Sequence, residues 1–559
     1  MKWLKFLALI VIFIVTTSLL VFIILGYLDV ELTHISENKR NEYLKLAIEG
    51  TEWMLQFQIT PPFYNWGWHT PCKGAWGGLA GYYTRAFKWA AAYGAESEHI
   101  VYVASHDTGW LLEILTKLYK ITGKRKYLEA AKLAADWCLR LQVGRSEWIK
   151  KFSNFYIKIS KEDRRVIWNY ASGLKLPNGT TGAFTEGMFF FSGLPPKFGE
   201  WSSGTNFAEP ATWIAPEHVN PIVSGLLELY EITKEKRYLE ASKVAINWLL
   251  MMQSREGGIY TSYPPEIYGI RMSDTAATAL TLFKAYDVTG NKTYLFAAIK
   301  CADFMLEYQN VMKGDFACGG IVHLSKAGGE WRQHSYFAGD AIAAILVWIE
   351  AYKRTNDTKY LCGELGTFEE PKGGALLAAE FVLRMQVTPF YYAWGSHSYS
   401  LDRGAIGGIY WVYIPSYGIL PYQFTSTASY AIRALLTLYK ELPQYISKRG
   451  IFKRAAELAY YWLTKTNIYA PSNRLNKLPG LIYVGDRHGL YKVGYVPSYK
   501  KYYDEIPGTM CGDPRQGFTV AMSVSGPVFA YLFLYEYSIA KAHSSTDHLR
   551  AIFLIKSPT

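Results

Sequence analysis

Apolar residues recur with a helical period along most of the chain. One kind of segment starts with Tyr-Leu, continues with apolar residues at i, i+3 and i+4 spacing, and reaches a Gln 15 residues after the Tyr. Four copies follow this pattern closely, a fifth contains an insertion, and a sixth is degenerate. They are Tyr43 to Gln58, Tyr127 to Gln142, Tyr238 to Gln253, Tyr294 to Gln309, Tyr360 to Gln386 and Phe452 to about Lys465. We predict an amphipathic helix in each.

A second kind of segment, more apolar on all sides, alternates with the first. These segments are Asp107 to Thr122, Glu217 to Thr233, Asp274 to Thr289, Asp340 to Thr355, Thr425 to Glu441 and Val520 to Tyr537. Two of them end in Thr-Gly, where Gly123 and Gly290 can take the left-handed conformation that follows a helix. The next Tyr-Leu segment starts a few residues later. The sequence therefore predicts helical hairpins with short turns, in which the more apolar helices lie inside.

The long connections lie on the other side of the hairpins, and most contain a Gly followed by a short β-like run. Five of the six do so, at Gly77, Gly257, Gly319, Gly407 and Gly480, and the second has the looser Thr181-Gly182-Ala183-Phe184. Helical repeats that cannot bury their apolar faces alone must stack, and twelve alternating helices can close into a double ring. We predict an all-α fold, an (α/α)6 toroid over residues 41–541 with short β-like segments in the long loops. An open solenoid is the alternative, but it would need polar capping repeats, which neither end of the repeat array shows.

The N-terminus has its own apolar pattern. Residues 6–25 form 20 consecutive uncharged positions, enough to cross a hydrocarbon core of about 30 Å. A cleaved signal peptide is the alternative, but its apolar region is shorter and ends in a small-residue cleavage site. Lys2 and Lys5 precede the span, so the positive-inside rule places the C-terminal domain outside the cell. We predict a cytoplasmic segment 1–5, a transmembrane anchor 6–27 in the lipid membrane, a linker 28–40 and a tail 542–559.

Composition excludes several classes of protein. Half of the residues are hydrophobic and 16% are aromatic, which is typical of a large packed core. The net charge of +12 is spread along the chain without a basic stripe or a nucleic-acid-binding motif, so a nucleic-acid partner is not expected. An anionic glycan or membrane surface suits this charge better. Because the chain lacks phosphate-loop, H-E-x-x-H and C-x-x-C motifs, we expect no cofactor and no catalytic metal.

Six cysteines would lie in an exterior compartment, where disulfides can form. Cys138 and Cys301 fall within predicted helices and are interpreted as buried thiols. Cys72 with Cys511 would join the first and last long connections. Six cysteines allow fifteen pairings, however, and the sequence does not choose among them.

Four of the predicted inner helices begin with an acid, and these acids should point toward the mouth of the ring. They are Asp107, Glu217, Asp274 and Asp340. Helix capping is the plainer interpretation, because acids suit the first turn of a helix. A catalytic role gains from their convergence, since glycosidic chemistry needs one protonated and one ionised carboxyl group across a cavity.

Aromatic and basic residues in the same loops are candidates for substrate binding, because aromatic rings suit the mixed faces of sugars. The candidates are Trp66, Trp68, His106, Tyr260, Arg271, Arg332, His334, Tyr336, Trp394 and Trp411. The run Arg332-Gln333-His334-Ser335-Tyr336 is the best candidate for abstracting a proton next to a carboxylate. Ordinary loop packing is the alternative for all of them.

The chain resembles the six-hairpin glycosidase superfamily over about 500 residues. Within it, His106-Asp107-Thr108-Gly109-Trp110 and Asp274-Thr275-Ala276-Ala277-Thr278-Ala279 are similar to two helix starts of the unsaturated glucuronyl hydrolases. The second run opens an earlier helix here than in that family, and the family's acidic proton donor has no clear counterpart unless Glu217 takes its place. The resemblance implies a toroid that acts on glycans.

Three functions follow as hypotheses. The first is a membrane-anchored, extracytoplasmic hydrolase that acts on an acidic, uronate-containing glycan by carboxylate acid and base chemistry. The second is a polysaccharide lyase or uronyl epimerase that uses Tyr, His and Arg, and the third is a non-catalytic glycan-binding surface protein. Product analysis separates them, because fold alone does not fix function.

Overall fold

A computed structural model gives the structure of the protein. It describes residues 37–56, 58–69, 76–79, 100–144, 179–185, 187–191, 207–211, 214–265, 269–326, 330–389, 405–466, 494–496, 501–502 and 525–540. The chain divides into two compact units, one of Met1–Leu46 with Tyr531–Thr559 and the other of Ala47–Ala530. The predicted anchor lies outside the described residues. Within them, no helix has both the length and the apolar character to cross a membrane.

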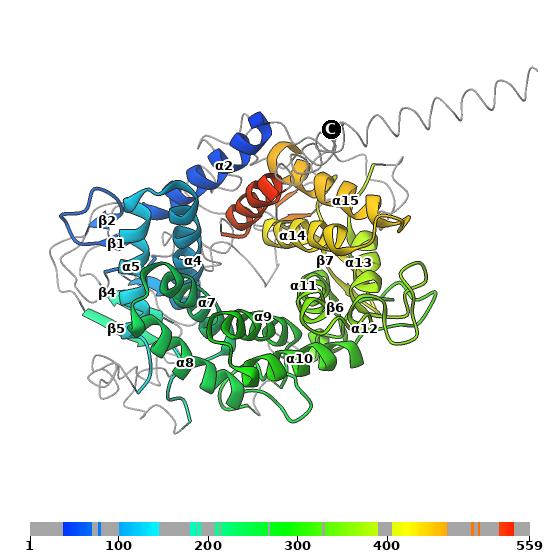
Figure 1. Ribbon diagram of the computed structural model, residues 1–559, viewed down its shortest axis with the longest axis horizontal. Coiled ribbons are helices and arrows are strands. Elements are labelled where there is room, and N and C mark those ends of the chain that lie inside the picture. The colour runs from blue at the N-terminus through cyan, green and yellow to red at the C-terminus, as the bar shows by residue number, and fades with distance from the viewer. Residues whose placement is uncertain are drawn as a thin grey trace, which may run out of the picture. The chain divides into compact units, whose positions relative to one another are not determined.

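Five helical hairpins follow one another in the unit Ala47–Ala530 (Figure 1). Their inner helices are α4 (Ser105–Thr122), α7 (Pro216–Thr233), α9 (Met272–Thr289), α11 (Ala338–Thr355) and α14 (Thr425–Glu441). Behind them lie α5 (Arg125–Arg140), α8 (Lys236–Met251), α10 (Lys292–Glu307), α13 (Gly374–Met385) and α15 (Arg449–Tyr461). Short elements accompany these, namely α12 (Lys359–Cys362), the 3₁₀ helix η2 (Glu330–His334) and the π-helical η3 (Trp462–Thr466). Each inner helix contacts the next along the series.

Two further helices complete the described part of the chain. They are α2 (Glu37–Leu55) and a helix over residues 525–540, and each crosses the boundary between the two units. The predicted hairpin helices are confirmed with small shifts at their ends. The inner helix at Thr425–Glu441 has the predicted bounds, whereas α9 and α11 begin two residues earlier than predicted.

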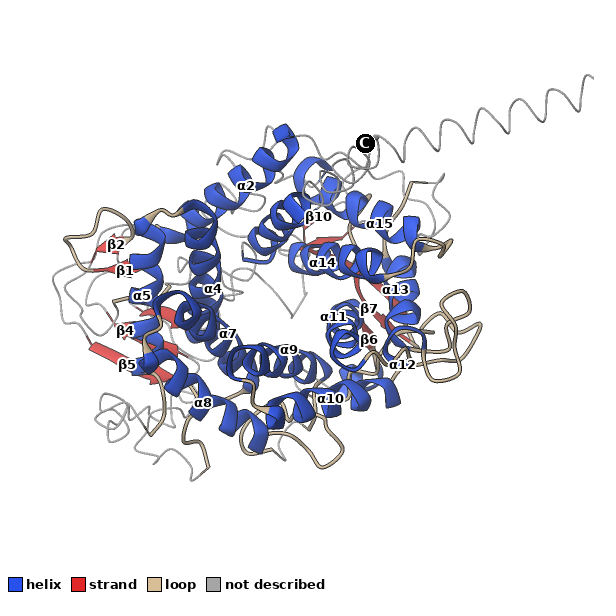
Figure 2. Cartoon of the chain, in the orientation of Figure 1, coloured by secondary structure: helices blue, strands red, loops and turns tan. Residues whose placement is uncertain are grey.

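Small sheets occupy the long connections, where only short β-like runs were predicted (Figure 2). The strands β1 (Ile59–Thr60) and β2 (Trp68–His69) are parallel. A three-stranded antiparallel sheet has the order β3-β4-β5, with β3 (Ile100–Ala104), β4 (Gly187–Phe191) and β5 (Phe207–Ala211). A five-stranded antiparallel sheet has the order β10-β9-β8-β7-β6, with β6 (Tyr336–Phe337), β7 (Tyr410–Ile414), β8 (Gly418–Phe424), β9 (Gly494–Val496) and β10 (Lys501–Tyr502).

The glutamine that closes each Tyr-Leu segment joins one hairpin to the next. Gln142 is buried, and its Nε2 donates to the carbonyl of Gly182 at 3.0 Å and to that of Ala241, in the following outer helix, at 2.9 Å. Gln58, Gln253, Gln309 and Gln386 each make the same pair of bonds to a loop glycine and the next outer helix. The bond to the glycine pairs a loop carbonyl, and the other bond adds a second donor to a carbonyl of the outer helix.

The loop glycine of each repeat is required by close approach. Gly319 has φ +90°, and a Cβ there would overlap the carbonyl oxygen of Leu377 in α13. Gly182, in the looser second connection, has φ +98° and meets the carbonyl of Val244 in the same way. Only glycine combines this conformation with this proximity.

Candidate active site at the starts of four helices

The four predicted acids lie in the first turns of α4, α7, α9 and α11. Asp107, Asp274 and Asp340 are buried, whereas the side chain of Glu217 is about one-third exposed. The N-cap positions of α9 and α11 are taken by Arg271 and Phe337, whose side chains form no capping hydrogen bond. Asp274 and Asp340 therefore are not N-caps, although they still suit the helix dipole.

Arg271 joins two of these acids. Its Nη2 lies 2.5 Å from Oε2 of Glu217 and 2.7 Å from Oδ1 of Asp274. Burial, together with the charges of Glu217 and Asp340, raises the pKa of Asp274 to about 7, against the opposing charge of Arg271. Burial also acts on Glu217, but the charges of Arg271, His218 and His106 outweigh it and lower the pKa of Glu217 to about 2. The site thus holds one carboxyl group that is easily protonated beside one that stays ionised.

Asp340 is paired with a histidine from the preceding loop. Nδ1 of His323 lies 2.7 Å from Oδ2 of Asp340, and both residues are buried. The ring of Phe337 packs against the imidazole, with centroids 4.5 Å apart. In the tautomer that donates from Nδ1 to this carboxylate, Nε2 is the free acceptor, and it has no hydrogen-bond partner among the described residues.

Two further histidines extend the cluster toward α4. Nε2 of His106 lies 3.2 Å from Oδ1 of Asp107, and the ring of His106 stacks on that of His218 with centroids 5.4 Å apart. Nε2 of His218 in turn lies 3.6 Å from Oε1 of Glu217. These contacts join the starts of α4, α7 and α9 in one polar cluster, and the charge of Asp340 at the start of α11 also acts on Asp274.

Several buried polar atoms of this cluster lack a hydrogen-bond partner among the described residues. They are Nδ1 of His106, Oδ1 of Asn220, Nε of Arg271, Oδ2 of Asp274 and Nε2 of His323. Buried polar groups in proteins are almost always paired. Donors and acceptors gathered in this way are suited to a ligand that carries many hydroxyl groups.

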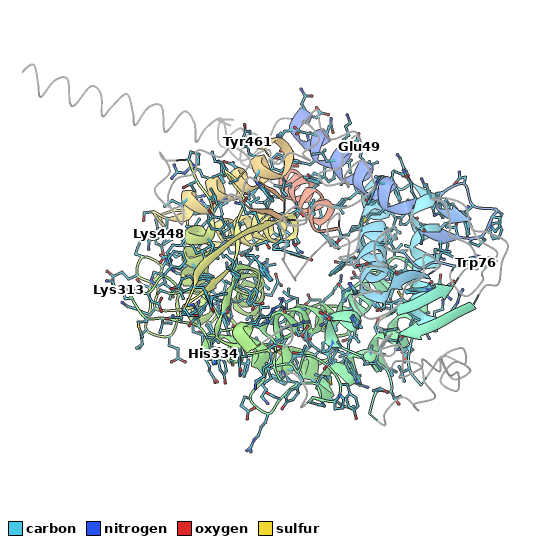
Figure 3. All side chains as sticks on the ribbon, turned by 180° about the vertical axis from the view of Figure 1, so that it is seen from behind. Glu49, Trp76, Lys313, His334, Lys448 and Tyr461 are labelled. Carbon is cyan, nitrogen blue, oxygen red and sulfur yellow. The ribbon has the colours of Figure 1, made fainter. Side chains whose placement is uncertain are left out.

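The run from Arg332 to Tyr336 does not form a single site. The guanidinium of Arg332 lies over the rings of Phe337 and Trp411, at 5.9 and 5.6 Å from their centroids. Tyr336 points to the opposite face of β6, toward Asn310 and Tyr413, because successive strand residues alternate. His334, labelled in Figure 3, is exposed on η2.

The other predicted substrate-binding aromatics are scattered. Trp66 is buried and donates from Nε1 to Oε1 of Gln58 at 3.0 Å, so it belongs to the packing of the first long connection. Tyr260 is half-buried and forms a β-bridge with Ile270, just before α9. The backbone of Trp68 lies in β2, while its side chain and all of Trp394 lie outside the described residues.

Neither a metal site nor a disulfide is found within the described residues. Within the described residues, no group of three His, Cys, Asp or Glu could hold a metal ion. Cys138 and Cys301 are buried thiols in α5 and α10, as predicted. The proposed partners Cys72 and Cys511 lie outside the described residues.

Sequence reasoning missed His218 and Asn220. Both lie within one turn of Glu217, and their spacing on α7 could have pointed to them once that helix was placed inside the ring. His323 lies in the loop before α11. Its partner Asp340 is 17 residues away, across a strand, and no local pattern joins them.

Comparison with known proteins gives no match at the level of sequence, because neither a protein-family model nor a curated protein matches the chain. Among solved structures, the chain is similar to a D-mannose isomerase at a TM-score of 0.53 and 11% identity, over 89% of this chain and 98% of that one. It is also similar to the cellobiose 2-epimerase of Bacillus thermoamylovorans B4167, at a TM-score of 0.52 and 11% identity, over 89% and 99% of the two chains.

The chain has the six-hairpin toroid fold. The resemblance to this superfamily seen in the sequence is thereby confirmed at the level of the fold. An unsaturated glucuronyl hydrolase from Streptococcus agalactiae aligns at a TM-score of 0.49 and 12% identity, over 90% of this chain and 93% of that one. In the six-hairpin fold, the long connections and the starts of the inner helices share one side, which is where the polar cluster lies.

Proposed function

We propose that the protein is a carbohydrate epimerase or isomerase in which His323, oriented by Asp340, moves a proton at a sugar carbon. The single observation that supports this most is the 2.7 Å contact between Nδ1 of His323 and Asp340, with Nε2 left as a buried base. A histidine held in this way is suited to general acid and base catalysis near neutral pH.

The reaction follows from where that base lies. Nε2 of His323 removes a proton from the carbon next to the carbonyl of an open-chain sugar, and the electron pair of the C–H bond moves toward the carbonyl oxygen. A nearby acid protonates that oxygen, giving an enediol. Return of a proton to the opposite face of the same carbon gives an epimer, and return to the neighbouring carbon gives an isomer.

Asp274 and Arg271 suit the role of supporting this enediol. Asp274, with its pKa raised to about 7, can hold the proton that the carbonyl oxygen needs, and Arg271 supplies fixed positive charge beside it. Fixed charges of this kind stabilise negative charge that develops in a transition state. Isomerase and epimerase neighbours that share the fold favour the same class of chemistry.

Hydrolysis is the second candidate, because Asp274 and Glu217 form the unequal carboxyl pair that glycosidases use. Their oxygens both contact one nitrogen of Arg271, at 2.7 and 2.5 Å, and so cannot lie farther apart than the sum of these distances. An inverting hydrolase needs about 6.5–9.5 Å between its carboxyl groups. This pair therefore suits only a retaining reaction.

The anchor and the acidic substrate are further parts of the proposal. The apolar residues 6–25 support a single-pass anchor with the catalytic domain outside the cell. A uronate-containing glycan is supported by Arg332, whose guanidinium rests on Phe337 beside His323. Such a ligand should bind more tightly than its carboxyl-reduced form, and added salt should weaken the binding.

Deuterium exchange tests the reaction. The full chain in detergent is incubated in D₂O with D-mannose, cellobiose and D-glucuronate, and products are followed by NMR. An epimerase or isomerase inserts deuterium at carbon, and His323→Asn abolishes the insertion while the thermal midpoint stays unchanged. New reducing ends from an oligosaccharide without deuterium at carbon would instead favour hydrolysis, and full exchange by His323→Asn would refute the role of the dyad.

A further inference from the structure

Directly beneath the acids, the next turns of α4, α7, α9 and α11 present a different set of side chains. Three residues after Asp107, Glu217, Asp274 and Asp340 come Trp110, Asn220, Ala277 and Ala343. Trp110, Ala277 and Ala343 are only partly buried. Because residues three apart share a helix face, this second layer continues the wall below the acids.

Asn220 is the polar member of this layer. It is 3% exposed, and its Nδ2 donates to Oγ1 of Thr278 at 3.0 Å, which fixes the amide. Its Oδ1 is buried and has no partner among the described residues. An acceptor held in this way costs about 1–3 kcal/mol unless something donates to it.

A third layer lies deeper and is internally satisfied. Oγ of Ser224 donates to Glu113 at 2.9 Å and accepts from Nζ of Lys284, also at 2.9 Å. Lys284 reaches Oε1 of Glu228 at 2.8 Å, and Lys117 contacts Glu113 and Glu228. This ionic layer joins α4, α7 and α9 and forms a floor under Asn220.

We propose that the second layer is a binding subsite for one terminal sugar unit, in which a sugar hydroxyl donates to Oδ1 of Asn220. The inference rests on the proposed function, since the occupant is a sugar. Trp110 offers an aromatic wall, while Ala277 and Ala343 are small side chains; all three are the sixth residues of their helices, and Asn220 is the fifth residue of α7. Because the ionic layer of α4, α7 and α9 lies beneath Asn220, the substrate binds with its end inward. The substrate class is therefore a free sugar or a chain end, rather than the interior of a long glycan.

Binding to an inactive protein tests the subsite without turnover. Dissociation constants of D-mannose, cellobiose and D-glucuronate are measured by calorimetry on His323→Asn, alone and combined with Asn220→Leu. We expect Asn220→Leu to weaken binding of the sugar that binds best about tenfold or more. One monodeoxy derivative of that sugar should bind the two proteins equally, because it lacks the donating hydroxyl.

Thr281→Val is the matched control. Thr281 lies on α9 and is buried like Asn220, but its hydroxyl already donates to the carbonyl of Ala277 in the same helix at 2.9 Å. Binding should change less than twofold. The subsite would be refuted if both variants weakened binding equally, or if no sugar bound. It would also be refuted if Asn220→Leu weakened the binding of every monodeoxy derivative to the same extent.

Chain-end action has its own readout. An oligosaccharide labelled at one end is treated with the unmodified enzyme, and the altered unit is located by mass spectrometry. Alteration confined to a terminal unit is expected, whereas alteration of internal units would refute end-on binding. If His323→Asn stays active while Asn220→Leu loses affinity, the subsite stands and the proposed reaction fails.

Discussion

His323 and Asp340 lie on different elements, a loop and the first turn of α11, yet their Nδ1 and Oδ2 atoms are 2.7 Å apart. Replacement Asp340→Asn should lower kcat about 10²-fold or more, because an amide can donate to Nδ1 and so favour the wrong tautomer. The measurement is steady-state kinetics with the sugar that turns over fastest. The thermal midpoint should change little, since Asn is nearly isosteric.

A pH profile separates this role from a structural one. The remaining activity of Asp340→Asn should depend on pH differently from that of the unmodified protein, because Nδ1 of His323 then faces a neutral amide in place of a carboxylate. An unchanged profile with unchanged kcat would show that Asp340 only stabilises the start of α11.

Stability should fall as pH rises through the range in which Asp274 ionises. Its pKa is raised from 3.8 to about 7, so between these values the folded state binds more protons than the unfolded chain. The contribution of Asp274 is thus present at low pH and is lost as pH approaches 7. Thermal midpoints measured from pH 4 to 8 should show this fall in the unmodified protein, and Asp274→Asn should reduce it.

Glu217 titrates with the opposite sign and in another window. Its pKa is lowered from 4.5 to about 2, so its stabilisation is present above about pH 4.5 and is lost as pH falls toward 2.

The charged groups that act on Asp274 are Arg271, Glu217 and Asp340. A fall of stability between pH 4 and 7 that persists fully in Asp274→Asn would contradict the assignment.

The glutamine contacts between hairpins should contribute strongly to stability. Gln142→Leu removes two hydrogen bonds and leaves the carbonyls of Gly182 and Ala241 buried without that donor. We expect a loss of about 1–3 kcal/mol, because the carbonyl of Gly182 is left unpaired while that of Ala241 keeps its bond within α8. Gln444→Leu, at an exposed position, is the control and should change stability by less than about 0.5 kcal/mol. Similar effects of the two changes would refute the role of Gln142.

Alanine substitutions at two glycines separate the stability cost of the left-handed backbone conformation from the cost of a close contact. Gly314 has φ +92° with nothing near its absent Cβ, whereas Gly319 has φ +90° and faces the carbonyl of Leu377. Gly314→Ala should cost about 1–2 kcal/mol for the left-handed conformation alone. Gly319→Ala should cost clearly more, because α13 must move as well. Denaturant unfolding of both variants compares them, and equal costs would mean that the helix yields easily.

Much of the fold was predictable because the chain repeats. Each hairpin must bury the same apolar stripe, so the helices recur with the same spacing and their ends are marked by Gly and Gln. The sheet of β3, β4 and β5 was not predictable, because its strands come from residues as far apart as Ile100 and Ala211. Strand pairing over such separations leaves no local pattern.

The candidate site was partly predictable for a similar reason. Asp107, Asp274 and Asp340 are each the third residue of their helix and Glu217 is the second residue of α7, so their convergence follows from the ring. Their partners do not repeat, since His323 comes from one loop and Arg271 from the N-cap of one helix. The separation of Arg332 from Tyr336 could not be predicted either. Arg332 packs on Phe337, and β6 places Tyr336 and Phe337 on opposite faces.

The direction of the glutamine contacts affects the order in which the hairpins fold during synthesis. Every one of the five glutamines bonds to an outer helix that lies 44 to 99 residues later in the chain. At about 5–20 residues per second, each hairpin emerges from the ribosome several seconds before the helix that completes it. Hairpins should therefore pack together one after another from the N-terminus. In a chain released early, the glutamine of the last finished hairpin would lack its bond to the next outer helix.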